Sequence, residues 1–501
     1  MSKQPTAALP YLLPLDHKLE EPLYLQLYHA LREAILNGQL SRGTQLPPTR
    51  VLASELAVSR TTVVTAFEQL FAEGYLEARV GSGTFVASAL PEEMLHVHAE
   101  KAPLPEKEKH PQLSQRSQRV MHSPLVPRVQ SPPAKAFQPG LPALDAFPFD
   151  VWSRLAVRHY QHPPFELLSY GDPAGYCPLR DAIARYLTAS RAVRCQPEQV
   201  LIFSGAQQAL DITARILLEE GDVVWMENPG YPRARGILLA SGARVVSVPL
   251  DQEGLNIEAG KRLGENARMA YVTPSHQYPM GITMSLPRRL ALLDWAQRAG
   301  AWILEDDYDS EFRYRGRPLA SLQGLDKHGQ VIYMGSFSKV LFPALRLGYL
   351  VLPPELVEPF IALRALYGRY APTVEQAIVT DFITEGHFLR HIRRMRALYA
   401  HRQQILVEAV QQELHGVLEL EEHDAGMHLI GWLPQTMDDH LVSQRIAEQG
   451  IDAQALSAYS EQKPERPGLI LGYAGVNDQE IRDGVRQIAN VIESLSKKHN
   501  R

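Results

Sequence analysis

The chain has 501 residues, of which 45% are hydrophobic and 21% charged, so it can form large packed cores and is not a disordered protein. Its length predicts two or three domains. The net charge of −5, taken over the whole chain, argues against a nucleic-acid-binding protein, although a small domain could differ from that sum.

The two cysteines, Cys177 and Cys195, form neither a CxxC pair nor a cluster with histidine, so we expect no disulfide framework and no zinc site. The apolar run near the N-terminus is broken by Pro10 and Pro14 and does not have the pattern of a signal peptide. No stretch approaches the roughly 18 apolar residues of a membrane span. We therefore expect a cytoplasmic protein without a membrane partner.

Helix and turn signals fill the first part of the chain. They predict helices over residues 22–37 and 48–56, a third helix capped by Ser59, and strands over residues 75–79 and 84–87 around the Gly81-Ser82-Gly83 turn. Three helices followed by a hairpin are typical of a winged helix-turn-helix domain, which we place at residues 12–88.

The third helix of such a domain enters the major groove of DNA by its N-terminal end. Arg60 carries a forked donor suited to a guanine edge or a phosphate, and the hydroxyls of Ser59, Thr61 and Thr62 suit phosphate or base contacts. Gly83 would let the wing approach the DNA backbone closely. On helical period alone, a protein-interaction domain with Arg60 on a solvated surface explains the pattern equally well.

The stretch LPPTRVLASELAVSRTTVVTAFEQLFAEGYLEARVGSGTFVA closely resembles the winged-helix domain of GntR-family bacterial regulators. The resemblance implies that DNA is contacted by Arg50, Ser59, Arg60, Thr61, Arg79 and Gly83. The domain is not basic, however, because residues 21–88 contain five arginines, no lysine and six glutamates. We therefore expect weak non-specific affinity that depends on a few arginines.

Residues 89–136 differ from both flanking parts in composition. They contain eight prolines and four histidines, and they show no sustained period of 3.6 or 2. We predict a flexible linker whose 48 residues span roughly 35–40 Å root-mean-square as a coil.

From residue 137 to residue 501, strand-like apolar runs alternate with helical stretches, which predicts an α/β domain with a mostly parallel sheet. Five predicted strands (residues 200–203, 223–226, 269–272, 302–304 and 331–334) are followed by the motifs SGAQQ, ENPGYP, TPSHQYP, EDDY and GSFSK. Ligands of open α/β sheets bind at the carboxyl ends of the strands, so these motifs should meet at one site.

The residue types in these motifs suit a phosphorylated cofactor with a carbonyl group. The helix start after Gly205 offers backbone N–H groups to an anion, and Ser336 and Arg346 add a hydroxyl and a guanidinium. Lys339 lies in a small polar turn beside apolar strands, where a lowered pKa would let it form a Schiff base. Asp306 could keep a pyridine nitrogen protonated.

Two tyrosines in the same motifs suit the ring of that cofactor. Tyr308 can donate to a phenolic oxygen, and Tyr231 can stack on a ring face, although Tyr231 would also suit a core position. His276 suits a structural hydrogen bond better than a catalytic base.

A magnesium site is an alternative reading of the acidic residues near Asp306. Asp307, Asp309 and Glu311 would supply the further carboxylates that Mg²⁺ prefers. That reading leaves the serine, arginine and lysine motifs without a role, so we predict no metal.

The motifs YGDPAGYCPLRDAIARYL, SGAQQALD, ENPGYP, TPSHQYPMG, EDDYDSEF and GSFSKVLFPALRLGY together resemble the fold-type I, class I aminotransferases across residues 137–501. The resemblance implies that pyridoxal 5′-phosphate (PLP) forms a Schiff base with Lys339, that Asp306 pairs with its ring nitrogen, and that Tyr308 contacts its hydroxyl. The other implied cofactor contacts are Tyr231 on the ring, Ala206, Gln207, Ser336 and Arg346 around the phosphate, and Tyr170 on the phosphate of a neighbouring subunit.

Two positions depart from the aminotransferase pattern. Tyr278, which we place among the cofactor-binding residues, stands where that family has asparagine. Ile470 stands near the expected place of the arginine that binds a substrate carboxylate. Arg233 or Arg235 could bind the carboxylate of an effector instead.

A GntR-type winged helix joined by a long linker to an aminotransferase-like domain resembles the MocR subfamily of bacterial transcriptional regulators. The resemblance implies a PLP-binding regulator that acts on a double-stranded DNA operator as a domain-swapped, head-to-tail homodimer. PLP or a small amino compound would be sensed without steady turnover. The alternatives are an active PLP-dependent aminotransferase that also binds DNA, and a DNA-binding protein whose C-terminal domain is empty.

Overall fold

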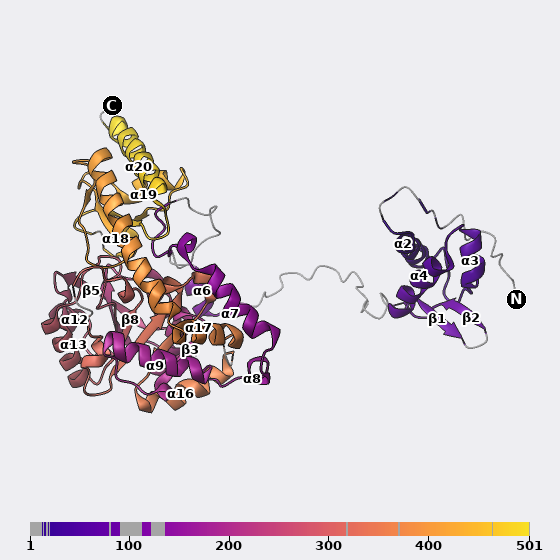
Figure 1. The fold of residues 1–501 in the computed structure, drawn as a ribbon, viewed down its shortest axis with the longest axis horizontal. Helices are drawn as coiled ribbons and strands as arrows, with labels where there is room; N and C mark the ends of the chain where they lie inside the picture. Colours follow the sequence, from indigo (N-terminus) through magenta and orange to yellow (C-terminus); the bar gives the residue numbers. More distant parts are fainter. Residues whose placement is uncertain are drawn as a thin grey trace, which may run out of the picture. The chain divides into compact units, whose positions relative to one another are not determined.

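The computed structural model describes residues 21–79, 82–90, 113–121, 136–316, 319–368, 371–462 and 464–499, together with Leu13, Leu15, Asp16 and Leu19. The chain divides into two compact units, Met1–Gln112 and Leu113–Arg501, and each is described here by itself (Figure 1).

The smaller unit is a winged helix-turn-helix. Its elements are α2 (Leu23–Leu36), α3 (Thr49–Glu55), α4 (Arg60–Ala72), β1 (Leu76–Arg79) and β2 (Gly83–Val86). The two strands pair antiparallel, with Leu76 opposite Val86. Helix α4 packs against both α2 and α3, and its fully buried Val63 and Leu70 share one core with Leu27 and Leu31 of α2. The predicted turn residue Gly81 lies outside the described residues.

An eight-stranded sheet forms the centre of the larger unit. In spatial order it consists of β3 (Val200–Phe203), β10 (Gly348–Val351), β9 (Val331–Ser336), β8 (Trp302–Asp307), β7 (Met269–Val272), β4 (Val223–Asn228), β5 (Arg244–Asp251) and β6 (Gly254–Leu255). The five strands β9, β8, β7, β4 and β5 are parallel to their neighbours in that group, whereas β10 is antiparallel to both β3 and β9. The mostly parallel sheet is therefore confirmed.

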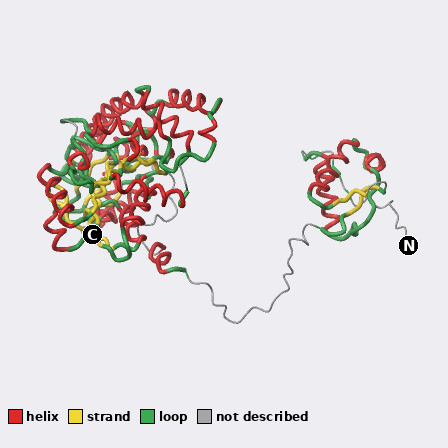
Figure 2. The backbone as a smooth tube through the Cα atoms, turned by 90° about the horizontal axis from the view of Figure 1, so that it is seen from below, coloured by secondary structure: helices red, strands yellow, loops and turns green. Residues whose placement is uncertain are grey.

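Helices cover both faces of this sheet, as Figure 2 shows for the larger unit. Alternating residues of β3 point to opposite faces, because Val200 and Ile202 belong to one core cluster and Leu201 and Phe203 to another. The first cluster includes residues of α9 (Cys177–Arg191), α17 (Thr373–Thr384) and α18 (His387–Glu413). The second includes residues of α10 (Ala206–Leu217), α11 (Pro232–Ser241) and α16 (Pro354–Leu366).

Further helices complete the sheet-bearing part of the larger unit. They are α7 (Phe149–Gln161), α8 (Phe165–Leu168), α12 (Ile257–Leu263), α13 (Leu286–Ala299), α14 (Leu322–Leu325) and α15 (Phe337–Val340). The last of these, α15, follows directly on β9 and carries Lys339.

The C-terminal part of the chain adds a small antiparallel sheet in the order β11 (Glu419–Leu420), β12 (His428–Trp432), β14 (Gly468–Gly472) and β13 (Gln454–Ala455). Helices α19 (Asp439–Ala447) and α20 (Asp478–His499) pack with each other, and α20 also packs against α18.

A short helix, α6 (Gln115–Met121), lies within the stretch that we predicted to be a flexible linker, residues 89–136. The expectation of a segment without regular structure is wrong there. Ser114 Oγ accepts a hydrogen bond of 3.2 Å from the backbone N–H of Ser117 at the helix start, and α6 packs against α11. A helix of two turns depends on such packing rather than on its own sequence period, so the pattern did not reveal it.

None of the helices among the described residues is both long enough and apolar enough to cross a membrane.

Candidate functional site

The junction between β3 and α10 holds the residues predicted to surround a phosphate, and we call it the anion cup. Gly205 precedes α10 with a φ of 96°, so the backbone N–H groups of Ala206 and Gln207 begin the helix without helical partners. Arg346 Nη2 donates to Ser204 O at 3.2 Å, and a Cβ added to Gly205 would lie 3.2 Å from the same nitrogen. Glycine therefore lets the Arg346 guanidinium lie against this helix start.

Ser336 lies at the same edge of the sheet as the cup. It ends β9, and its Oγ accepts a hydrogen bond of 3.1 Å from the N–H of Ser338 at the start of α15. Gly348 of β10 is paired with Phe203 on one side and with Ser336 on the other. The ends of β3 and β9 therefore lie on either side of Gly348. The residues predicted to surround a phosphate are thus brought together.

Lys339 is the partly buried third residue of α15, and its Nζ donates a hydrogen bond of 2.8 Å to the carbonyl oxygen of Gly140. Burial lowers the pKa of Lys339, although Asp309 and Asp306 oppose that shift. A lysine with a lowered pKa is more often neutral, and the neutral amine is the form that attacks a carbonyl. The side chain therefore suits covalent attachment of an aldehyde.

Asp306 is buried near the carboxyl end of β8 and accepts a hydrogen bond of 2.5 Å from the hydroxyl of Tyr271 on the neighbouring strand β7. Burial raises the pKa of Asp306 to about 7, although the hydrogen bond from Tyr271 opposes that shift. A positive ring nitrogen placed beside Asp306 would favour its ionised form. Asp306 therefore fits the role of a pyridinium partner.

His276 joins Tyr308 to Asp309 next to this site. Its Nδ1 lies 2.9 Å from the Tyr308 hydroxyl and 2.9 Å from Asp309 Oδ2, and all three side chains follow the ends of β7 and β8. In the tautomer whose Nδ1 carries the proton, His276 donates to Asp309 Oδ2. These contacts agree with the structural role expected for His276.

Tyr278 belongs to a group of aromatic rings beside Tyr308. Its ring is edge-on to those of Tyr231 and Tyr308, with centroids 5.7 and 5.6 Å apart, and its hydroxyl lies 3.3 Å from that of Tyr459. Tyr459 was not predicted, because the short segment that carries it contains no recognisable motif. The tyrosine found in place of asparagine is thus held by other aromatic side chains.

The two arginines considered for an effector carboxylate differ in their surroundings. Arg235 forms an ion pair with Glu461 and donates to Ser247 Oγ at 2.8 Å, so its guanidinium is already engaged. Arg233 is exposed. Burial of Lys339 lowers the pKa of that lysine, and the positive charge of Arg233 lowers it further. Ile470 is fully buried in an apolar cluster, so its position offers no charge.

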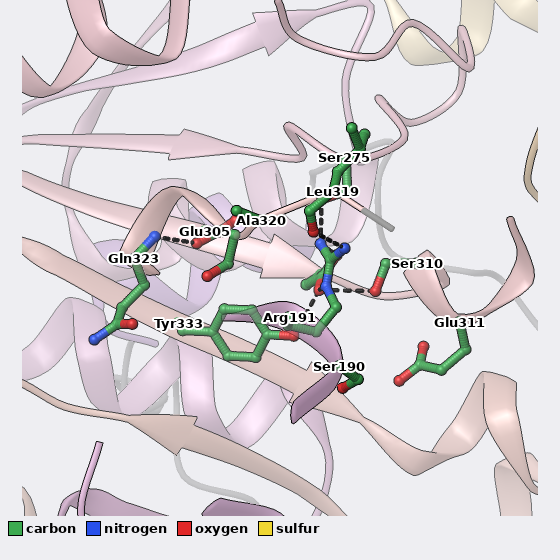
Figure 3. A network of polar contacts seen from close by, with 12 residues as sticks. Ser190, Arg191, Ser275, Glu305, Ser310, Glu311, Leu319, Ala320, Gln323 and Tyr333 are labelled. Atoms are coloured by element: carbon green, nitrogen blue, oxygen red, sulfur yellow. Dashed lines mark hydrogen bonds and ion pairs between the residues drawn. The ribbon is translucent and has the colours of Figure 1, made fainter. Parts of the chain in front are cut away.

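Asp307 at the end of β8 and the two acidic residues that follow, Asp309 and Glu311, have separate partners. Figure 3 shows Arg191, Ser310 and Tyr333 gathered beside the end of this strand. Arg191 Nε donates to Asp307 Oδ2 at 2.8 Å, and Ser310 and Tyr333 donate to the same carboxylate. Asp309 contacts His276, and Glu311 accepts from Tyr186 at 3.3 Å. The described part of the chain holds no group of three His, Cys, Asp or Glu side chains placed to bind a metal.

The smaller unit presents a separate candidate site at the start of α4. Ser59 Oγ caps the helix by accepting from Thr62 N at 3.0 Å, and it lies 2.8 Å from the Thr62 hydroxyl. Arg60 and Thr61 are exposed in the first turn of α4, and Arg50 is exposed in the first turn of α3. The cap therefore fixes the end of the helix from which Arg60 projects.

The wing holds its arginine through contacts within the hairpin. Arg79 donates to Glu77 at 2.7 Å and lies over the ring of Phe85, 4.6 Å from its centroid. Gly83 has a φ of 109°, which favours glycine, and Gln45 Nε2 donates to Ser82 O at 2.6 Å beside it. Contact between Arg79 and DNA would have to compete with Glu77.

Two family descriptions match the sequence. The description "Bacterial regulatory proteins, gntR family" matches residues 23–86, and "Aminotransferase class I and II" matches residues 149–488. The matched regions correspond to the winged helix and to most of the larger unit.

Three known proteins illustrate these similarities. The "Probable rhizopine catabolism regulatory protein MocR" of Rhizobium meliloti is 43% identical over 97% of this chain and 96% of its own length. The "HTH-type pyridoxine biosynthesis transcriptional regulator PdxR" of Corynebacterium glutamicum is 30% identical over 96% of this chain and 98% of its own length. The solved structure of α-aminoadipate aminotransferase from Thermus thermophilus is 28% identical, with a TM-score of 0.69 over 77% of this chain and 98% of that one.

Proposed function

This chain belongs to the MocR subfamily of GntR-family transcriptional regulators, and we propose that its larger unit holds PLP at Lys339 and senses PLP or a small amino compound. The observation that carries this proposal is the meeting of three features at one sheet edge. They are a lysine with a lowered pKa, a buried carboxyl partner at Asp306 and the anion cup at Gly205.

The residues of the site fit this cofactor. The cup at Ala206, Gln207, Ser336 and Arg346 would hold the phosphate, and Asp306 would pair with the ring nitrogen. Tyr308 would contact the ring hydroxyl, and Tyr231 would lie on the ring beside Tyr278. When bound, PLP supplies an aldehyde that condenses with amines and a ring that withdraws electrons. Lys339 would hold it as a Schiff base.

A sensor fits the pocket better than a turnover enzyme. Ile470, near the expected place of the carboxylate-binding arginine of aminotransferases, is fully buried. Arg233 is the better candidate for contact with an effector carboxylate, because Arg235 is paired with Glu461. An exposed arginine holds a carboxylate less firmly than a buried one, because water screens the charges.

The hydrogen bond between Lys339 and Gly140 could couple cofactor binding to the position of the linker. Gly140 follows Ala136 and Phe137, which form bridges with Ile451 and Gly472 where the chain enters the domain. A lysine that carries the cofactor retains at most one N–H on its nitrogen, so cofactor binding competes with the Gly140 contact. A ligand shifts a conformational equilibrium only through such a difference in contacts.

A homodimer is part of the proposal. Tyr170, which would reach the phosphate of a neighbouring subunit, is 80% exposed. Three large apolar side chains are also exposed, namely Phe165 and Leu168 of α8 and Leu366 at the end of α16. Helix α8 itself packs against α17. Exposed apolar side chains of this size are typical of a subunit interface. Two tethered winged helices could then bind successive half-sites of a DNA operator through Arg60 and its neighbours.

Visible absorbance of the purified chain mixed with PLP tests the cofactor proposal. We expect an absorbance band at longer wavelength than that of free PLP in the wild type and in Lys327→Ala, which changes an exposed lysine outside the motifs of the site. Lys339→Ala should lose the band. Equal spectra for the two variants would contradict the assignment of Lys339.

A further inference from the structure

We propose that the larger unit has a second ligand site, a cavity behind His276 that accepts a small zwitterion with an amine and a carboxylate. The cavity has a volume of about 250 Å³ and is lined by His276, Thr283, Arg313, His423 and Asp424, among others. Cavities for drug-sized ligands measure roughly 300–1,000 Å³, so this one suits a molecule of amino-acid size.

The cavity lies on the side of His276 that faces away from Tyr308. Whereas Nδ1 of His276 contacts Tyr308 and Asp309, its buried Nε2 has no hydrogen-bond partner among the described residues. A Cβ added to Gly281, which lines the cavity, would lie 3.2 Å from this Nε2. The unpartnered nitrogen therefore lies at the wall of the cavity, and it is an acceptor in the tautomer whose Nδ1 donates to Asp309. An ammonium group is a donor that fits it.

His423 adds a second imidazole with an unsatisfied nitrogen. Its Nδ1 is buried and has no partner within the described part of the chain, and burial lowers the pKa of His423 to about 4. The ring is therefore neutral near pH 7 and can offer one donor and one acceptor. Buried polar atoms without partners are uncommon in folded proteins and point to an absent water or ligand.

Arg313 supplies the positive end of the cavity. Its Nη2 donates to Thr283 Oγ1 at 3.1 Å, and within the described residues no carboxylate lies at ion-pair distance from its guanidinium. Burial lowers the pKa of Arg313, and Asp424 opposes that shift. A carboxylate bound by Arg313 would therefore offset the cost of its partial burial.

Asp424 places a negative charge at the same cavity. The residue is exposed, whereas its backbone carbonyl accepts a hydrogen bond of 2.7 Å from the backbone N–H of Tyr314. Glu422, the other acid of the lining, is paired with Arg315 at 3.0 Å and is less available. A ligand with only an ammonium group would leave Arg313 without a carboxylate, and a ligand with only a carboxylate would leave His276 and Asp424 without an ammonium. A zwitterion supplies both groups and therefore fits best.

The test is titration calorimetry of the full chain carrying Lys339→Ala, which removes the proposed attachment point for the cofactor. The probes are glycine, L-alanine and 4-aminobutyrate, with acetate and methylamine as ligands that carry only one of the two charges. We expect at least one zwitterion to bind, and acetate and methylamine to bind more weakly.

Variants of the cavity locate the binding. Arg313→Met should weaken zwitterion binding roughly 10- to 100-fold, the usual effect of losing a charge-assisted contact. Asp424→Asn, at an exposed position that tolerates substitution, should weaken it several-fold. Arg298→Met is the control and should leave binding unchanged, because neither Arg298 nor its ion-pair partner Asp294 lines the cavity.

Three results would overturn the proposal. They are the absence of binding by all three zwitterions, equal losses in Arg313→Met and Arg298→Met, and binding in the wild type that disappears in Lys339→Ala. The last result would place the amino compound at the cofactor site. The visible spectrum of the wild type reports separately on PLP, so the two sites can fail independently.

Discussion

The amine nitrogen of Lys339 lies 2.8 Å from the carbonyl oxygen of Gly140, a residue 199 positions earlier in the chain. Gly140 has a φ of 72°, in the region that favours glycine, and a Cβ added there would lie 2.5 Å from that nitrogen. The segment that enters the domain from the linker thus passes directly over the lysine. The state of Lys339 can therefore affect where this segment lies.

Gly140→Ala should weaken PLP binding and reduce its effect on DNA binding. The added methyl would displace Lys339 Nζ and add backbone strain of roughly 1–2 kcal/mol. Gly300→Ala is the control, because Gly300 has a φ of 62° and no atom within 4 Å of the added Cβ. Absorbance titration with PLP measures the difference. Equal PLP affinity in the two variants would refute the importance of the Gly140 contact.

Tyr271→Phe should make PLP binding more dependent on pH. The hydroxyl of Tyr271 favours the ionised form of Asp306, whose pKa burial has raised to about 7. Removing the hydroxyl raises this pKa further, so less Asp306 is ionised at neutral pH. We expect weaker PLP binding near pH 7 that recovers as the pH rises, measured by absorbance titration at several pH values. An unchanged pH profile would count against Asp306 as the ring partner.

Glu227→Gln should stabilise the domain at alkaline pH and have little effect at acid pH. Burial raises the pKa of Glu227 from 4.5 to about 7, although hydrogen bonds from Thr273 and Gln277 oppose that shift. The folded state therefore retains a proton that the unfolded state has released, and the free energy of unfolding falls as the pH rises from about 4.5 to 7.

Glutamine keeps the shape of Glu227 and stays neutral, so the variant should escape this loss. We expect a gain on the order of 2 kcal/mol at pH 8 relative to the wild type, and almost none at pH 4. Urea unfolding at both pH values measures it. A stability difference that is the same at both pH values would show that Glu227 is not the titrating group.

Arg60→Ala should weaken DNA binding by about 1–3 kcal/mol and relax the preference for one base. Arg60→Lys separates the two ways in which this exposed side chain could act. Lysine keeps the charge but loses the fork, so it should restore binding if Arg60 contacts a phosphate and fail if it reads guanine. Fluorescence anisotropy with DNA selected from a random library measures both. Unchanged binding in Arg60→Ala would mean that α4 does not enter the groove.

The sequence predicted the framework of the cofactor site because that site is built from strand ends. The predicted strands 200–203 and 269–272 match β3 and β7, whereas β4, β8 and β9 continue two or three residues further. Polar residues at these ends still pair in the ladder, as Asp307 does with Gly335. Asp306 and Ser336 consequently lie on rigid strands rather than in the loops that follow them.

Contacts between distant segments could not be predicted. Arg191 ends α9 in a stretch without a motif, and only the fold brings it to Asp307, 116 residues later. Arg235 looked available for an effector, but Glu461 reaches it from the C-terminal part of the chain. Helix α6 escaped prediction for the same reason, because packing on α11 rather than local pattern supports it.

The central claim is that PLP at Lys339 controls DNA binding, and one titration tests it most directly. DNA selected from a random library is titrated with the wild type and with Lys339→Ala, each with and without PLP, and binding is followed by anisotropy and footprinting. We predict that PLP changes the affinity or the footprint of the wild type but not of Lys339→Ala. Identical affinities and footprints for the wild type with and without PLP would contradict the account.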